Sequence, residues 1–395
     1  MADVILTNVR PWGGAPADIV VSGGEIRSVL PAGTAPEDGD HLDGGGLLAL
    51  PGFINAHAHV DKSWWGQPWV SYGGEATTQG RISHERAERD ALGIPSTDST
   101  TAVLREFLRH GTTAVRSHVD VDLGVGLRGI EVVREAVAAL DGAVEVEIVA
   151  FPQDGVVRRP GVLDLLDRAA AAGATSIGGL DPASIDRDPV AQLDGLFSIA
   201  ERRGVGLDIH LHDRGELGAF QFELIIDRTL RTGLRGRVTV SHGFALGELP
   251  ADRQLRLVEA CAEAGVSWAT VAPVRTAPLP WRGMREHGVP IGLGTDGIRD
   301  LWSPYGDGDI LRVALGFARL HGLRTDEELA HAVELATTRA AGFVHRAAHD
   351  LVAGARADIV LLDAENVQDA LVRAPRRQLV LAGGRVVVRD GELRV

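Results

Sequence analysis

The sequence is almost without cysteine, and it lacks both an excess of positive charge and a long apolar run. Its one cysteine, Cys261, excludes an internal disulfide and a cysteine-rich zinc site, and it fits a reducing compartment. The net charge of −14 at pH 7 argues against nucleic acid or an anionic membrane as a partner, because both are bound by basic patches. No apolar run reaches membrane-spanning length, and Met1 to Val4 lacks the basic start of a secretory signal. We therefore expect a soluble cytoplasmic protein.

The 395 residues, of which 45% are apolar and 24% charged, are typical of a globular chain longer than one ordinary domain. Strand-like apolar runs alternate with segments of helical periodicity, and the runs fall at 53–59, 113–119, 145–153, 175–180, 206–212, 237–242, 266–272 and 290–296. Their spacing of roughly 30 residues is that of a βαβ unit, so eight units predict a (β/α)8 TIM-like barrel over residues 51–345. The first connection, from 61 to about 97, exceeds the usual few residues, which predicts a lid or an interaction surface.

The two ends of the chain contain short strands and turns instead of this alternation. Strand-like runs at 4–6, 18–21, 26–29 and 47–50 have counterparts at 358–362, 379–381 and 385–388. Neither end has enough strands to bury a core alone. We expect residues 1–50 and 346–395 to form one small β-sandwich; two independent β appendages are the alternative.

Histidine and carboxylate side chains gather where the predicted barrel strands end. The first strand ends in His57-Ala58-His59, and these two imidazoles share one face because strand side chains alternate. Later strand ends carry the residues His118, Asp120, Gln153, Asp154, His210, His212, Asp213, His242 and Asp296. Chemistry in such barrels lies at the carboxyl ends of the strands, and imidazole with carboxylate suits zinc or ferrous iron. The sequence therefore predicts a metal site at the barrel mouth.

These motifs resemble those of the amidohydrolase superfamily, and within it the cytosine-deaminase-like group. The matching stretches are Pro51 to His59, Arg116 to Asp120, Ala150 to Gln153, the histidines of the fifth and sixth strands, and Asp296 with Trp302. Three further stretches, 178–183, 210–213 and 298–302, are more similar to the triazine-degrading branch, the N-isopropylammelide isopropylamidohydrolases. The resemblance covers essentially the whole chain.

The resemblance implies a mononuclear site that holds one divalent metal ion, Zn²⁺ or Fe²⁺. The ligands that it implies are His57, His59, His210 and Asp296. Binuclear relatives carry a bridging residue, often a carboxylated lysine, at the end of the fourth strand. Here that strand ends in Leu180-Asp181, and the only lysine of the chain, Lys62, follows the first strand instead. Asp181 is the residue there that could contact a second ion.

Catalytic roles follow from this assignment. A bound divalent ion lowers the pKa of its water from about 15.7 towards roughly 7, which gives hydroxide at neutral pH. Asp296 would accept the proton of that water, and His242 would polarise it or hydrogen-bond the developing tetrahedral centre. Asp213 matches the region where cytosine deaminases carry a proton-shuttling glutamate, but it is one methylene shorter. His212 could take that role or orient the site, and His118 is expected to pack near the metal.

The substrate-binding candidates are Gln153, Trp302, Lys62 and Asp181. Gln153 matches a glutamine that reads the polar edge of a pyrimidine in the resembled family, and its amide offers a donor and an acceptor. A strand-end cap is the alternative role for it. Trp302 and the lid residues Trp64, Trp65 and Trp69 could wall a flat heteroaromatic ring, and we expect one or two of them to touch it.

Gly297 is a departure from the resembled group, whose cytosine deaminases carry a second acid directly after the metal-binding aspartate of strand eight. The glycine is expected to remove a polar wall and to leave space at the substrate edge. That space would favour a ring with a bulkier substituent over plain cytosine.

The predicted function is hydrolysis of a non-peptide carbon–nitrogen bond in a small heterocyclic substrate. The enzyme would deaminate a cytosine-like pyrimidine, or remove an amine or alkylamine from an s-triazine-type ring. Hydrolysis of a cyclic amide is the alternative, and it would yield a ring-opened acid instead of a free amine. A non-catalytic scaffold is disfavoured because every ligand position is filled. The oligomeric state, including a homo-oligomer, is left open.

Overall fold

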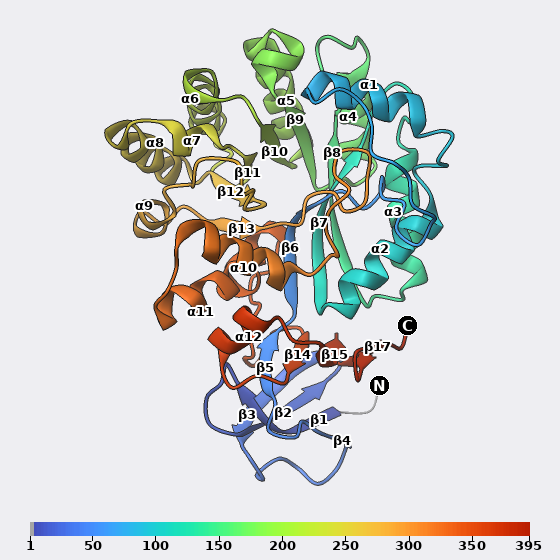
Figure 1. Cartoon of the computed structure of the whole chain (residues 1–395), viewed down its shortest axis with the longest axis vertical. Coiled ribbons are helices and arrows are strands. Elements are labelled where there is room, and N and C mark those ends of the chain that lie inside the picture. The colour runs from blue at the N-terminus through green and yellow to red at the C-terminus, as the bar shows by residue number, and fades with distance from the viewer. Residues whose placement is uncertain (1–3) are drawn as a thin grey trace.

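The computed structural model describes residues 4–395 and consists of a barrel surrounded by helices, with a second sheet at one end (Figure 1). Residues 1–3, on which the prediction about a secretory signal rests, lie outside the described residues. Within residues 4–395, no helix has both the length and the apolar character needed to cross a membrane.

An eight-stranded parallel sheet runs in the order β13-β12-β11-β10-β9-β8-β7-β6. Its strands are β6 (Phe53–Ala58), β7 (Thr112–Asp120), β8 (Glu145–Phe151), β9 (Ser176–Leu180), β10 (Gly206–Leu211), β11 (Val238–His242), β12 (Ser267–Thr270) and β13 (Ile291–Leu293). The outer strands meet through a parallel bridge between Ala58 and Asp296 and a 3.0 Å hydrogen bond from Asp296 N to His57 O. The sheet is thus a nearly closed barrel, which confirms the α/β prediction. Asp296 lies beyond β13, because the last strand is shorter than predicted.

Gly294 allows the two outer strands to approach. A Cβ on this residue would lie 2.4 Å from the Cβ of His57 and 2.5 Å from its carbonyl oxygen. Real side chains do not tolerate such distances, so any larger residue would push the end of β13 away from β6. The closure that joins Asp296 to His57 therefore depends on this glycine.

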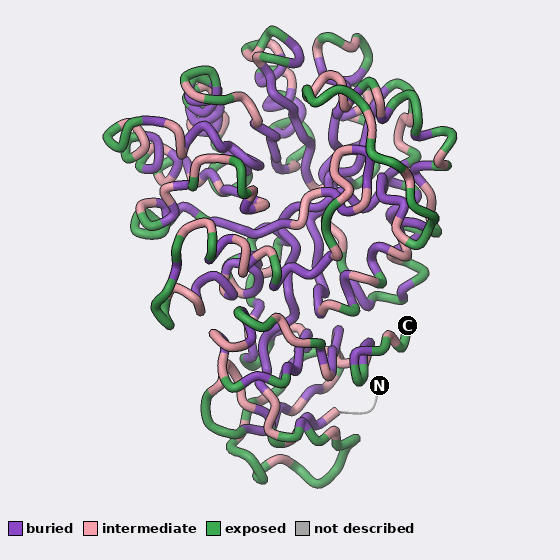
Figure 2. Tube along the Cα trace, viewed as in Figure 1, coloured by how far each residue is buried: buried purple, intermediate pink, exposed green. Residues whose placement is uncertain are grey.

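Helices follow most of the barrel strands and cover the outside of the barrel (Figure 1). They are α2 (Thr97–Arg109), α3 (Arg128–Ala139), α4 (Val162–Ala171), α5 (Pro189–Arg203), α6 (Gly215–Thr232), α7 (Ala245–Glu248), α8 (Ala251–Ala264), α9 (Trp281–Glu286), α10 (Ile310–His321) and α11 (Asp326–Glu334), with short turns at η1 (Pro182–Asp186) and η2 (Thr338–Val344). In α4, Val162, Leu166 and Ala169 are buried, at the spacing of one helical face. Figure 2 shows the same pattern for the barrel, with buried strands inside and exposed turns outside.

The long connection after β6 contains one helix, α1 (Thr78–Glu88), which the sequence analysis did not predict. Trp64 of this connection is buried against Ile94 and Leu301, so the segment packs on the loop that follows β13. Thr78 and Arg81 line the cavity at the barrel mouth. The segment therefore covers part of the mouth, in line with the lid predicted there.

Strands from both chain ends share a nine-stranded sheet in the order β17-β16-β15-β14-β5-β1-β2-β3, with β4 paired to β1. The strands are β1 (Val4–Pro11), β2 (Ala17–Ser22), β3 (Glu25–Pro31), β4 (Asp40–Asp43), β5 (Leu48–Pro51), β14 (Ile359–Leu362), β15 (Arg377–Ala382), β16 (Arg385–Arg389) and β17 (Glu392–Leu393), and α12 (Val367–Arg373) lies between β14 and β15. Because β14 pairs antiparallel with β5, the two ends are not independent appendages. The two-layer sandwich and the domain limits stay predictions.

Candidate metal centre and active site

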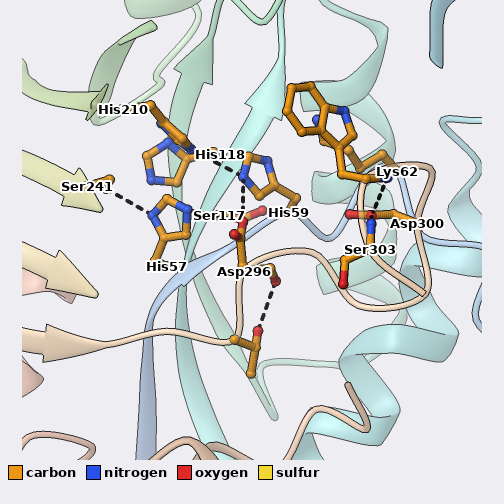
Figure 3. Close-up of polar contacts among 12 residues, drawn as sticks. His57, His59, Lys62, Ser117, His118, His210, Ser241, Asp296, Asp300 and Ser303 are labelled. Atoms are coloured by element: carbon orange, nitrogen blue, oxygen red, sulfur yellow. Dashed lines mark hydrogen bonds and ion pairs between the residues drawn. The ribbon is translucent and has the colours of Figure 1, made fainter. Parts of the chain in front are cut away.

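His57, His59, His210 and Asp296 converge at the mouth of the barrel (Figure 3). His57 lies in β6 and His59 just after it, His210 lies in β10, and Asp296 follows β13. Asp296 Oδ1 is 3.5 Å from His57 Nε2 and 3.3 Å from His59 Nε2. His210 Nε2 is 3.4 Å from His59 Nε2. The structure thus brings together the four side chains predicted as metal ligands.

The donor atoms of this group suit a cation. His57 Nε2 is buried and has no hydrogen-bond partner within the described chain, which is rare for a buried polar atom. Burial lowers the pKa of His59 and of His210 well below the ordinary value, so both imidazoles are neutral, the form that binds metal. Burial would raise the pKa of Asp296, but the neighbouring His57 and His59 rings hold that pKa well below the usual range. Three imidazoles and one carboxylate fit zinc or ferrous iron.

A buried chain of polar groups orients the His57 ring through its Nδ1 atom. His57 Nδ1 lies 3.0 Å from Ser241 Oγ, and that hydroxyl donates to Asp208 Oδ1 at 2.6 Å. Arg116 Nε lies 3.0 Å from Asp208 Oδ2 and compensates its charge. His118 also contacts Asp208, at 3.5 Å, and its ring centre is 4.3 Å from that of His57. This arrangement leaves Nε2 of His57 free to face the metal position.

The sequence analysis did not identify Asp208 or Ser241 as members of the site. Asp208 stands two residues before His210 on the same strand, so both side chains share one face of β10. Ser241 directly precedes His242 in β11. A search for polar residues on the inner faces of the barrel strands would have found both.

His242 lies beside the predicted ligands in a strained backbone conformation. Its candidate ligand atom lies within 4.8 Å of those of His57 and His210. His242 and Asp296 have positive φ angles of 68° and 61°, which cost about 1–3 kcal/mol for residues other than glycine. Such strain is typical of sites where function fixes the backbone.

His212 and Asp213, the two alternatives for a proton shuttle, occupy different environments. His212 lines the cavity, and its ring stacks on that of His242 with centres 4.4 Å apart. Its Nδ1 lies 2.9 Å from Asp181 Oδ2. Burial would lower the pKa of His212, but the Asp181 carboxylate raises it above the ordinary value. Asp213 instead accepts a 2.9 Å hydrogen bond from Gln221 and does not line the cavity.

Asp181 holds His212 in place by hydrogen bonds and does not line the cavity. Besides the contact with the ring, its Oδ1 accepts hydrogen bonds from the backbone N–H groups of His212 and Asp213, at 2.5 and 3.2 Å. Asp181 is buried, and its φ of 33° is another positive value in the site. Its geometry gives it a role in orienting His212.

Lys62 and Gln153 belong to a buried polar cluster on one wall of the cavity. Lys62 Nζ donates to Gln153 Oε1 at 2.5 Å and lies 2.9 Å from Asp120 Oδ1. Gln153 Nε2 donates to Glu85 Oε2 at 2.5 Å, and the indole N–H of Trp302 donates to the same oxygen. Burial would lower the pKa of Lys62, but Asp120 and Glu85 raise it above its ordinary value. Glu85, which the sequence analysis missed, reaches this wall from the lid helix α1.

The cavity beside the metal ligands has a volume of about 320 Å³, which suits a small heterocycle. Phe151, Leu180 and Trp302 supply its apolar walls. Of the predicted tryptophans, Trp302 lines the cavity, whereas Trp64 is buried in the lid and Trp69 is 63% exposed. Lid packing therefore accounts for Trp64.

The expectation that Gly297 leaves space at the substrate edge is wrong. A Cβ on Gly297 would lie 1.6 Å from Oδ2 of Asp300, so the carboxyl of Asp300 already fills this position. Asp300 lines the cavity, and burial raises its pKa to about 7. Asp300, three residues farther along the chain, supplies the polar wall that the sequence analysis expected to be missing.

Comparisons with known proteins agree with this geometry. Residues 95–395 match the amidohydrolase family. The chain is similar to the crystal structure of N-isopropylammelide isopropylaminohydrolase from Burkholderia multivorans, with 42% identity, a TM-score of 0.95 and 100% coverage of both chains. It is 28% identical over 369 residues, 89% of this chain and 88% of the relative, to N-isopropylammelide isopropyl amidohydrolase of Pseudomonas sp.. It is 29% identical over 396 residues, 95% of this chain and 88% of the relative, to pterin deaminase of Rhizobium rhizogenes.

Proposed function

This chain belongs to the amidohydrolase family and is a metal-dependent hydrolase of carbon–nitrogen bonds other than peptide bonds, and we propose that it releases an amine or alkylamine from a nitrogen-rich heterocycle. The substrate class is an s-triazine of the ammelide type, with a cytosine-like pyrimidine as the second choice. The 42% identity over the full length of an N-isopropylammelide isopropylaminohydrolase favours the triazine.

One observation carries the proposal. Three imidazoles and the carboxylate of Asp296 face one point on the wall of a cavity of about 320 Å³. His57, His59, His210 and Asp296 would hold a divalent cation there. When bound, such a cation lowers the pKa of a coordinated water towards about 7 and so supplies a nucleophile at neutral pH.

The protein's own groups around that point have distinct tasks. Asp296 Oδ1 faces His57 and His59, which leaves the carboxylate able to accept a proton from water at the same position. His242 lies on the cavity side of these ligands and would hydrogen-bond the oxygen that becomes negative in the transition state. Its fixed, strained backbone favours this role because the donor needs no reorganisation.

His212 is the proposed proton donor to the leaving amine. Its Nδ1 is engaged by Asp181, so its other ring nitrogen is the one available to the cavity. The Asp181 carboxylate stabilises the protonated ring, as required of a group that carries a proton from water to the amine. Asp213, turned towards Gln221, is the less suitable of the two candidates.

The cluster of Lys62, Gln153 and Glu85 would hold the ring edge opposite the metal. Gln153 is fixed by Lys62 on its oxygen and by Glu85 on its nitrogen, so its orientation is set before a substrate arrives. Trp302, anchored by its hydrogen bond to Glu85, would stack on the face of a flat ring. This wall favours a ring that carries polar atoms along its edge.

The test is a screen of the purified protein loaded with Zn²⁺ or Fe²⁺. N-isopropylammelide, ammelide, cytosine, isocytosine and a pterin are each incubated with it, and ammonia and isopropylamine are measured separately. Release of isopropylamine from N-isopropylammelide is the expected result. A ring-opened acid without free amine would replace this function by hydrolysis of a cyclic amide.

A further inference from the structure

Gly297 and Asp300 share one position in the wall of the cavity. Gly297 does not have a positive φ angle, so its backbone conformation does not require a glycine. The three atoms nearest to a Cβ built there all belong to Asp300, whose Oδ2, Cγ and Oδ1 would lie at 1.6, 2.6 and 3.2 Å. The glycine is therefore needed because the carboxyl of Asp300 occupies the place of its side chain.

The orientation of Asp300 is fixed by its own turn. Its Oδ1 accepts hydrogen bonds from the backbone N–H groups of Trp302 and Ser303, at 2.9 and 2.7 Å, and its own N–H donates to the carbonyl of Ser303 at 3.0 Å. The residue is only 1% exposed. With Oδ1 engaged, Oδ2 is the oxygen directed at Gly297, and no donor within residues 4–395 hydrogen-bonds to it.

This free oxygen lies in the substrate cavity, next to the metal-binding Asp296. Asp296, Gly297 and Asp300 all line the cavity, together with Trp302 and Ser303, and Figure 3 shows Asp300 across from the histidines. A carboxyl oxygen in the lining of a cavity, with no donor from the chain, is available to accept a hydrogen bond from a ligand.

We propose that Oδ2 of Asp300 determines specificity by accepting a hydrogen bond from an N–H group of the substrate beside the scissile carbon. The inference rests on the proposed function and narrows its substrate class. The ionised carboxyl accepts a hydrogen bond from rings with an amino or imino N–H at this edge, which are therefore favoured over rings that present a carbonyl oxygen there. The inference also predicts that this carboxyl group can be supplied by residue 297 or by residue 300, but not by both, because the two side chains would collide.

Asp300→Asn is the first test, because the amide oxygen still accepts from Trp302 and Ser303 while Oδ2 becomes a donor. With N-isopropylammelide and cytosine as probes, we expect KM to rise about tenfold to a hundredfold, with kcat changed much less. Bound metal and Tm should stay at wild-type values. An unchanged KM would overturn the inference and leave the proposed function standing. If the wild-type protein releases amine from neither probe, the proposed function fails and the inference fails with it.

A relocation experiment separates substrate binding from a purely structural role of the turn. Asp300→Ser retains an oxygen for the turn but removes the acid from the cavity, and Gly297→Asp adds an acid at the other position. We expect Asp300→Ser to bind the probes weakly, Gly297→Asp alone to be impaired by collision, and the double variant to recover at least tenfold in kcat/KM over Asp300→Ser. If the double variant is no better than either single variant, Asp300 serves only the turn and the inference is overturned.

Discussion

Removal of the Ser241 hydroxyl should weaken metal binding although Ser241 does not touch the metal position. The hydroxyl lies 3.0 Å from Nδ1 of His57 and donates to Asp208 at 2.6 Å, so it holds the imidazole with Nε2 directed at the other ligands. Partners of this kind typically change metal affinity by about tenfold to a hundredfold, or roughly 1.4–2.8 kcal/mol. We expect that loss for Ser241→Ala.

The chain offers a matched control in Ser117→Ala. Ser117 is as deeply buried as Ser241 and lies on another barrel strand, β7, but its hydroxyl accepts from the backbone N–H of Val60 at 3.2 Å. Ser241→Ala removes a partner of His57 Nδ1 and Asp208 Oδ1, and Ser117→Ala removes the acceptor of the Val60 N–H, so each should destabilise the fold by about 1–3 kcal/mol. Only Ser241→Ala removes a contact to a metal ligand.

The assay is competition for Zn²⁺ between apo-protein and a chromophoric chelator, with thermal unfolding measured for both metal-free variants. We expect similar Tm values for the two variants and a weaker Zn²⁺ affinity for Ser241→Ala alone. Equal affinities in the two variants would show that the hydroxyl does not orient His57, and the argument from the polar chain behind the site would have to be abandoned.

Three further predictions concern other parts of the molecule. Asp296→Asn should abolish amine release, because it removes the one negative charge among the four predicted ligands, and it should leave the circular dichroism spectrum unchanged. Near-normal turnover in this variant would show that Asp296 has no part in the mechanism. His242→Asn should retain the metal and lose rate, whereas loss of metal in elemental analysis would make His242 a ligand. Burial and Arg282 lower the pKa of His321 to about 4, below the 6.5 of the unfolded chain. Because the unfolded state then binds the proton first, the folded state should lose stability as pH falls from 6.5 to about 4, and His321→Asn should remove that part of the pH dependence measured by denaturant titration.

The metal ligands could be predicted from the sequence because two simple regularities determine their positions. Alternation along a strand directs His57 and His59 to one face, and the parallel barrel brings the ends of distant strands, including that of His210, to one mouth. Neither regularity depends on side-chain conformations. The convergence of these side chains could therefore be predicted even where strand limits differ by a few residues, whereas the choice of the four predicted ligands depended on the family resemblance.

The rest of the site depends on conformations that no residue pattern specifies. Whether His212 or Asp213 faces the cavity is decided by the Asp181 carboxylate, which holds one of them by its ring. Glu85 comes from a lid helix in a connection whose length gave no indication of its path. Asp300 fills the space above Gly297 only because a tight turn folds its side chain back. Each of these is a tertiary contact between segments whose local sequence reads as loop.

The contact between His57 and Asp296 has a consequence for how the protein matures. These residues lie at the ends of the first and last strands of the barrel. The seam between them is held by the Ala58–Asp296 bridge with the hydrogen bond from Asp296 N to His57 O, and by two hydrogen bonds between Asn55 and Thr295. A cation bound by His57 and Asp296 would cross-link the first and last strands and so stabilise the closed barrel at this seam. Because Asp296 is synthesised after the three predicted histidine ligands, the full ligand set forms only when the last barrel strand is in place, and we expect metal binding and closure of the barrel to be coupled.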